Sequence, residues 1–132
     1  MYDKWKIKRW ETPVSDSKWL GMVSLHDVAE TDILDIRLND GKQEISIKFE
    51  NYPAYRNILE EYRTALWRHL DETSQRCGWT FEVVESSWPA ELSKDEPLLE
   101  FHNPALRHFV ISTGDDVIEV LSNLEPKIEI IV

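Results

Sequence analysis

Hydrophobic and polar residues alternate along much of this chain, which is the pattern of half-buried β-strands. The alternation is clearest at Ile33 to Leu38 and at Glu44 to Phe49, where every second residue is Leu, Ile or Phe. These two runs flank Asn39-Asp40-Gly41, a turn sequence that is typical of β-hairpins. The sequence therefore predicts a hairpin here. Further strands are predicted at residues 4–8, 19–25, 79–84, 106–112, 117–121 and 127–132.

A different spacing begins at Pro53, a residue that suits the first turn of a helix. Apolar residues then recur at intervals of three and four, so we expect one amphipathic helix of about twenty residues, packed across the sheet. Its apolar stripe consists of Tyr55, Ile58, Leu59, Tyr62, Leu66, His69 and Leu70. Arg56 stands four residues before Glu60, a spacing that favours a weak surface ion pair and not a functional site. A proline-rich connector, residues 86–104, follows later in the chain, with a short helix expected at 89–94.

The order of these elements indicates an α+β domain with a largely antiparallel sheet and one main amphipathic helix across it. A chain of 132 residues suits one hydrophobic core, so residues 1–132 are expected to form a single domain. The sequence has no apolar run of membrane-spanning length and no signal-peptide pattern, and its one cysteine, Cys77, fits a reducing compartment. We therefore expect a cytoplasmic protein.

The charge of the chain is uneven. Its net charge is −10, and residues 77–132 contribute eleven carboxylates against only three bases, Lys94, Arg107 and Lys127. The first ten residues are instead net basic. An acidic surface attracts basic partners and repels nucleic acid and anionic membranes through the same field. A basic protein is therefore the expected partner, and neither nucleic acid nor a membrane is expected.

Cofactor and metal chemistry have little support in the sequence. It contains no glycine-rich phosphate loop and no dinucleotide fingerprint, so no cofactor is expected. The group that most resembles a metal site is His26 with Asp27, Glu30 and Asp32. Only one histidine joins these carboxylates, and carboxylates in a turn of an acidic protein are commonplace. No metal site is expected.

Catalytic residues are also not evident, and we do not expect an enzyme. A hydrolase would depend on Glu100, His102 and His108 converging on a cleft, with a histidine as the base. A helix cap or a core hydrogen bond is the simpler interpretation of both histidines. Ser112 and Ser122 lie outside any nucleophile-elbow pattern, although a triad assembled from distant residues would leave no such pattern. This hydrolase remains the second alternative function.

Six tryptophans offer another possibility, since aromatic side chains line many ligand pockets. Most are expected in the core. Trp67, on the flank of the predicted helix, and Trp88, in the acidic connector, are the two that stand apart. A pocket between helix and sheet lined by either of them would make the chain a small-molecule or sugar-binding module, which is the first alternative function.

The C-terminal part of the chain carries a family resemblance. Its segments are GWTFEVVESS at 78–87, LRHFVIST at 106–113, DVIEVLS at 116–122 and EP at 125–126. Together they resemble small bacterial immunity proteins that are encoded beside polymorphic toxins, including the toxins of contact-dependent growth inhibition. Several members of that group are similar to sheet-and-helix folds of the Whirly type. The resemblance covers about residues 78–126 and consists of the spacing of hydrophobic residues and a few short sequence segments.

The resemblance implies a cytoplasmic protein that binds a cognate basic toxin domain, commonly a nuclease, and occludes its active site. Carboxylates would then speed association by electrostatic steering, while a few aromatic side chains supply most of the affinity. We expect the acidic connector and the last hairpin turn to carry these contacts. The predicted contact residues are Glu85, Trp88, Glu91, Glu96, Glu100, Asp115 and Asp116.

Overall fold

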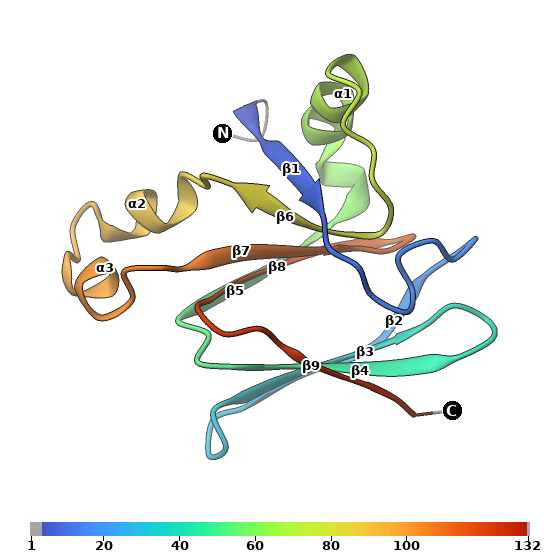
Figure 1. The fold of residues 1–132 in the computed structure, drawn as a ribbon, viewed down its shortest axis with the longest axis horizontal. Coiled ribbons are helices and arrows are strands. Elements are labelled where there is room, and N and C mark those ends of the chain that lie inside the picture. Colours follow the sequence, from blue (N-terminus) through green and yellow to red (C-terminus); the bar gives the residue numbers. More distant parts are fainter. Residues whose placement is uncertain (1–3, 132) are drawn as a thin grey trace.

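Two antiparallel β-sheets pack face to face in this computed structural model, which describes residues 4–131 (Figure 1). The strands are β1 (Lys6–Arg9), β2 (Gly21–Val28), β3 (Ile33–Asn39), β4 (Glu44–Glu50), β5 (Ala54–Leu59), β6 (Thr80–Val84), β7 (Arg107–Ser112), β8 (Asp116–Ser122) and β9 (Lys127–Ile130). The five-stranded sheet has the order β1-β6-β7-β8-β5, and the four-stranded sheet has the order β2-β3-β4-β9. The predicted antiparallel α+β class is confirmed, with the strands divided between two sheets.

The predicted strands are all present, each within three residues of its expected bounds. The β3–β4 hairpin is confirmed in register, with Ile36 opposite Ile47. Gly41 occupies its turn with a φ of 91°, a conformation that glycine adopts without the steric cost of a side chain. Val132, the last residue of the final predicted strand, lies outside the described residues.

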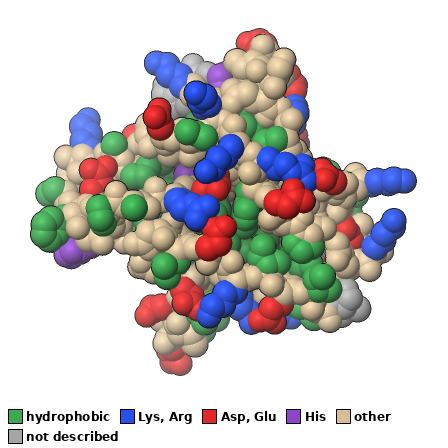
Figure 2. Space-filling view, viewed as in Figure 1, with side chains coloured by type: hydrophobic (Ala, Val, Ile, Leu, Met, Phe, Trp, Pro, Cys, Tyr) green, Lys and Arg blue, Asp and Glu red, His purple; other side chains and the backbone are tan. Residues whose placement is uncertain are grey.

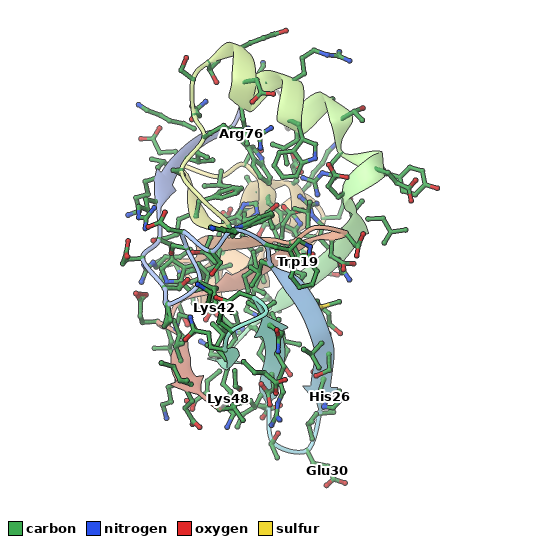
Figure 3. All side chains as sticks on the ribbon, turned by 90° about the vertical axis from the view of Figure 1, so that its right-hand side faces the viewer. Trp19, His26, Glu30, Lys42, Lys48 and Arg76 are labelled. Atoms are coloured by element: carbon green, nitrogen blue, oxygen red, sulfur yellow. The ribbon has the colours of Figure 1, made fainter. Side chains whose placement is uncertain are left out.

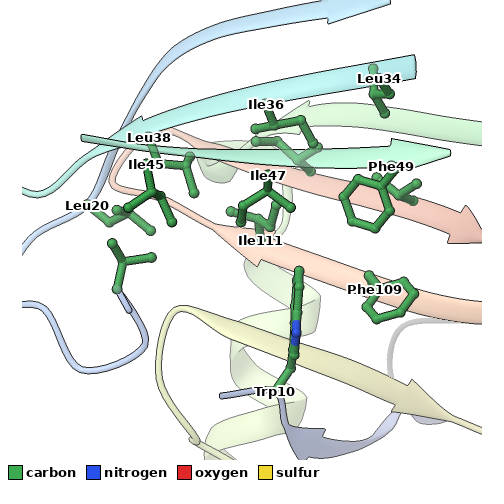
Figure 4. Close-up of a cluster of buried hydrophobic side chains, with 13 residues drawn as sticks. Trp10, Leu20, Leu34, Ile36, Leu38, Ile45, Ile47, Phe49, Phe109 and Ile111 are labelled. Carbon is green, nitrogen blue, oxygen red and sulfur yellow. The ribbon is translucent and has the colours of Figure 1, made fainter. Parts of the chain in front are cut away.

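The main hydrophobic core fills the space between the two sheets (Figure 4). It forms because the alternating positions of β3 and β4 point toward the alternating positions of β7 and β8. Trp10 closes this core at one side, with its ring 5.0 Å from that of Phe109. The core residues that Figure 4 labels are Trp10, Leu20, Leu34, Ile36, Leu38, Ile45, Ile47, Phe49, Phe109 and Ile111.

The prediction of one long helix from Pro53 is wrong in its first half. Residues Ala54–Leu59 form β5, and the helix α1 spans only Thr64–Glu72, after a short 3-10 turn, η2 (Glu60–Tyr62). β5 pairs with β8 from Asp116 to Leu121, whose backbone groups would otherwise have no partner on that side. Over six residues, alternation and helical spacing fit the same sequence, and this long-range pairing decided between them.

Helix α1 keeps the predicted amphipathic packing. Leu66 and Leu70 are buried against Phe81 and Val110, on the face of the five-stranded sheet that points away from the main core. Within the described part of the chain, no helix is long and apolar enough to cross a membrane.

The proline-rich connector forms two short helices, α2 (Trp88–Ser93) and α3 (Leu98–His102). Figure 1 shows that they project from the end of the sheet at which β6 ends and β7 begins. We call residues 85–104 the α2–α3 arm. The helix predicted at 89–94 corresponds to α2, whereas α3 was not predicted.

Candidate functional site

The predicted contact residues lie at two opposite ends of the five-stranded sheet. Four of them are exposed on the arm: Glu85, Glu91, Glu96 and Glu100. Two more lie at the other end, exposed Asp115 in the turn between β7 and β8 and half-buried Asp116 at the start of β8, and the seventh, Trp88, belongs to α2. The arm precedes β7 and the turn follows it, so a six-residue strand of roughly 20 Å separates the two groups (Figure 1). The predicted acidic surface is therefore two surfaces, of which the arm holds more carboxylates.

The arm also displays large apolar side chains to solvent. Phe101 is 78% exposed, the highest fraction among the exposed large hydrophobic residues of the described chain, and Leu98 is 58% exposed. Figure 2 shows hydrophobic side chains at the tip of the projection formed by α2 and α3, with acidic side chains beside them. Residues 85–102 carry five carboxylates and only one base, Lys94. The arm thus combines apolar contact area with net negative charge.

Trp88 does not lie on that surface, contrary to the prediction. It is only 7% exposed, and its ring lies 5.0 Å from the His108 ring. The guanidinium of Arg56 lies over the same ring, with Cζ 4.1 Å from the centroid, in a cation–π contact. Trp88 therefore anchors the arm to the sheet and leaves direct contact with a partner to the exposed side chains around it.

A buried charged cluster lies beneath Trp88, with Glu119 of β8 at its centre. Arg56 of β5 stands directly opposite Glu119 and donates two hydrogen bonds to its carboxylate, at 2.8 and 2.9 Å. Arg63, which precedes α1, donates a third at 2.6 Å, and Nε2 of His108 on β7 lies 2.8 Å from Oε1. Arg63, His108 and Glu119 are all withdrawn from solvent. We call these four residues the Glu119 cluster.

The cluster fixes the charges of its members. Burial by itself would raise the pKa of Glu119, but hydrogen bonds from His108 and Arg56 and the charge of Arg63 outweigh it and bring the pKa to about 2. Burial lowers the pKa of His108 by more than the nearby carboxylate raises it. At neutral pH Glu119 is therefore an anion and His108 is a neutral imidazole.

His108 also links the cluster to the start of the arm. Its Nδ1 accepts a hydrogen bond of 2.7 Å from the hydroxyl of Ser86. Ser86 lies between β6 and α2, directly after Glu85, whose φ of 52° is rare for a residue other than glycine. The ring of Trp5 packs against the imidazole in a T-shaped arrangement, with the two ring centroids 5.1 Å apart. Both ring nitrogens of His108 are thus engaged.

The hydrolase site expected from Glu100, His102 and His108 is not assembled in this form. His108 bonds to Ser86 and Glu119, while the other two residues are exposed on α3. The ring of His102 instead lies 5.6 Å from that of its neighbour Phe101. Of the three residues only His108 is buried, and the carboxylate that it contacts is that of Glu119 and not that of Glu100.

The residues of the metal-like group are likewise not brought together. Figure 3 shows Glu30 at the tip of the β2–β3 hairpin and His26 on the strand that leads to it. Asp27, on the same strand, accepts a hydrogen bond from the hydroxyl of Tyr52, which follows β4. Among residues 4–131 no three His, Cys, Asp or Glu side chains lie close enough together to hold a metal ion.

Trp67, the other tryptophan that the sequence set apart, lines a cavity between α1 and the five-stranded sheet. The cavity measures about 440 Å³, and Trp79, Leu70 and Cys77 also line it. Arg76 lies over the Trp67 ring at 4.9 Å, at the rim. The indole nitrogen of Trp67 is buried and has no hydrogen-bond partner within the described chain. A pocket between helix and sheet lined by Trp67 is what the small-molecule alternative requires.

Sequence reasoning missed Arg63 and Glu119, and its surface pair between Arg56 and Glu60 is wrong, because Arg56 lies on β5 and pairs with the buried Glu119. One signal was available for Glu119: it is a lone carboxylate inside Val117-Ile118-Glu119-Val120-Leu121, a run whose other members are all apolar. An acid in such a strand needs a buried partner, because an unpaired charge in the core is strongly destabilising. The identity of the partners depends on which strands pair, and the sequence does not give that directly.

Comparisons with known proteins add no relative: no family model, no curated protein and no solved structure matches the chain.

Proposed function

We propose that this chain is an immunity protein: an acidic cytoplasmic protein that binds a cognate basic toxin domain and neutralises it by covering its active site. The α2–α3 arm is the proposed contact surface. The proposal joins the family resemblance of residues 78–126 to the chemistry of the arm.

The observation that carries the proposal is the exposure of Phe101 and Leu98 among an excess of carboxylates. Aromatic and apolar side chains supply most of the affinity in protein interfaces, and charged groups at the rim speed association with an oppositely charged partner. A nuclease attracts phosphates with basic residues, so a group of carboxylates on a projecting arm fits into the same site. Glu91 and Glu96 would meet the basic residues, and Phe101 would pack against their apolar surroundings.

The anchoring of the arm supports this use. Trp88 holds α2 against Arg56 and His108, so the arm does not have to be ordered when a partner arrives. A preformed surface loses less conformational entropy on binding than a flexible one. The Glu119 cluster thus acts as the support of the interface and does not contact the toxin.

The proposal expects the neighbouring upstream gene to encode a large secreted protein with a toxic C-terminal domain, and the test uses that domain. Association is measured at low and high salt for the wild-type chain and for the double variant Glu91→Lys/Glu96→Lys. We expect binding that weakens with salt, and an association rate that is about tenfold lower in the double variant because steering is lost. In cells that produce the toxin domain, growth protection by the double variant should also fall.

The matched control is Asp115→Lys/Asp116→Lys, which changes the net charge equally at the other end of the sheet. It should associate much faster than the arm variant. Equal slowing by both variants would show that only net charge matters and would remove the arm from the proposal. Failure of the upstream domain to bind the wild-type chain would overturn the function itself.

A second candidate function is the binding of a small aromatic molecule beside Trp67. It is favoured by the 440 Å³ cavity and by the buried, unpartnered indole nitrogen, which a ligand carbonyl would satisfy. A titration with benzamide, followed by NMR, is expected to show saturable shifts in the wild-type chain and none in Trp67→Ala. Shifts that stay linear in both would exclude this candidate.

A further inference from the structure

We propose that Ser86 is a nucleophile, activated by His108 and Glu119, that hydrolyses small carboxylic esters through an acyl-serine intermediate. The activity is separate from partner binding and does not depend on the proposed immunity function. It also differs from the hydrolase that the sequence suggested, because neither Glu100 nor His102 takes part.

The geometry is a continuous chain of two hydrogen bonds that runs from the segment after β6 through β7 to β8. The Ser86 hydroxyl donates to His108 Nδ1 at 2.7 Å, and His108 Nε2 lies 2.8 Å from Glu119 Oε1. A nucleophile, a base within hydrogen-bond reach and an acid that orients the base are the three parts of a serine hydrolase triad. Here the serine faces Nδ1 and the acid faces Nε2, the reverse of the familiar serine proteases.

The neighbouring charges set the direction of these hydrogen bonds. Arg56 and Arg63 hold Glu119 as an anion, which can only accept, so His108 carries its proton on Nε2. Nδ1 then carries no proton, and its lone pair accepts the hydrogen bond from the Ser86 hydroxyl. The same two arginines weaken His108 as a base, so turnover should be slow and covalent capture is the more sensitive measurement.

Ser86 is also accessible to a substrate, unlike His108 and Glu119. It is half-buried and lines a surface hollow of about 310 Å³, together with Lys4 and Trp5. Lys4 is the one base among the residues that line the hollow and would face a developing oxyanion, while Glu85 and Glu91 line it too and would oppose that charge, which adds to the reasons for slow turnover. Ser86 lies in a strand-to-helix turn, as the nucleophiles of many hydrolases do, but the positive φ belongs here to the preceding Glu85.

The proposed reaction balances with water as the only co-reactant. The Ser86 oxygen attacks the ester carbonyl carbon while its proton passes to His108 Nδ1. The tetrahedral intermediate collapses, the bond to the alcohol oxygen breaks, and His108 returns the proton to the leaving alkoxide. Water then attacks the acyl-serine through the same base, which releases the acid and restores the hydroxyl of Ser86.

The experiment treats the purified full chain with a fluorophosphonate, which phosphonylates an activated serine with loss of fluoride. Peptide mass mapping should find the adduct on Ser86. The variant Ser86→Ala should lose it, and Ser87→Ala, which removes the exposed neighbouring hydroxyl, should keep it. Release of p-nitrophenol from p-nitrophenyl acetate should fall by at least about tenfold in Ser86→Ala only.

A pH profile of the labelling rate tests the role of His108 in the wild-type chain, without a substitution of a buried residue that would disturb folding. The groups facing His108 are Glu119, Arg56, Arg63 and the Ser86 hydroxyl. Because burial keeps the imidazole neutral, the rate of labelling should decline only below pH 6.5, the ordinary value for histidine. Absence of a Ser86 adduct, or equal labelling of Ser87, would overturn the proposal and leave the triad a structural network.

Discussion

Arg63 donates a hydrogen bond of 2.6 Å from Nη1 to Oε2 of Glu119, and both side chains are almost completely withdrawn from solvent. This ion pair joins the start of α1 to the middle of the five-stranded sheet. Two charges in such a place are stable only while both are present and their hydrogen bonds are complete.

Replacement of Glu119 by Gln should strongly destabilise the fold. The neutral amide removes the buried charge with which Arg63 and Arg56 pair, and breaking a buried pair in this way costs about 3–5 kcal/mol. The free energy of unfolding in urea measures the loss. Asp71→Asn is the control, because it removes an exposed ion pair with Arg76 and should change stability little. Equal losses in the two variants would contradict the importance of burial.

Trp88→Ala should release the arm from the sheet. The substitution removes the ring that packs on Arg56 and His108, and loss of a buried tryptophan typically costs about 3–5 kcal/mol. Limited proteolysis should then cut within residues 89–104 much faster than in the wild-type chain. Phe101→Ala, in the same arm but exposed, should leave the cutting rate unchanged. An arm that stays resistant in Trp88→Ala would show that other contacts hold it.

The stability of the protein should fall as the pH is lowered, in two steps. The folded pKa of His108 lies below the 6.5 of an ordinary histidine, so the unfolded chain takes up a proton first, and stability falls as the pH drops below 6.5. Glu119 has a folded pKa of about 2 against an ordinary 4.5, so its contribution is complete above 4.5 and is lost from there down to about 2.

Urea unfolding at a series of pH values measures both steps. His108→Gln should lack the first step, whereas His102→Gln, on the exposed surface of α3, should retain it. A first step that survives in His108→Gln would assign the effect to another group.

Phe101→Ala should weaken binding of the toxin domain mainly through faster dissociation. An exposed aromatic side chain at the tip of the arm is the expected anchor, and such residues contribute about 2 kcal/mol or more to an interface. Tyr62→Ala is the matched control, because Tyr62 is 72% exposed and lies outside the arm. Dissociation rates from surface plasmon resonance distinguish the two. A larger effect at Tyr62 would move the interface to that end of the sheet.

The sequence by itself determined the features that depend on neighbouring residues. Alternation specified β3 and β4, and Gly41 specified their turn, because side-chain period and turn geometry are local properties. The acidity and exposure of Glu91 and Glu96 were equally predictable, since a proline-rich polar connector stays on the surface.

Only the tertiary structure decided what depends on pairing between distant segments. β5 is a strand because β8 offered it a full ladder of hydrogen bonds, and that pairing placed Arg56 against Glu119. The same arrangement buried Trp88 and separated Asp115 from the arm. It also brought Ser86 and Glu119 within hydrogen-bond distance of His108. Each of these contacts joins residues that are separated in the chain. It stabilises the protein only once the sheet has formed, so the local pattern of residues does not predict it.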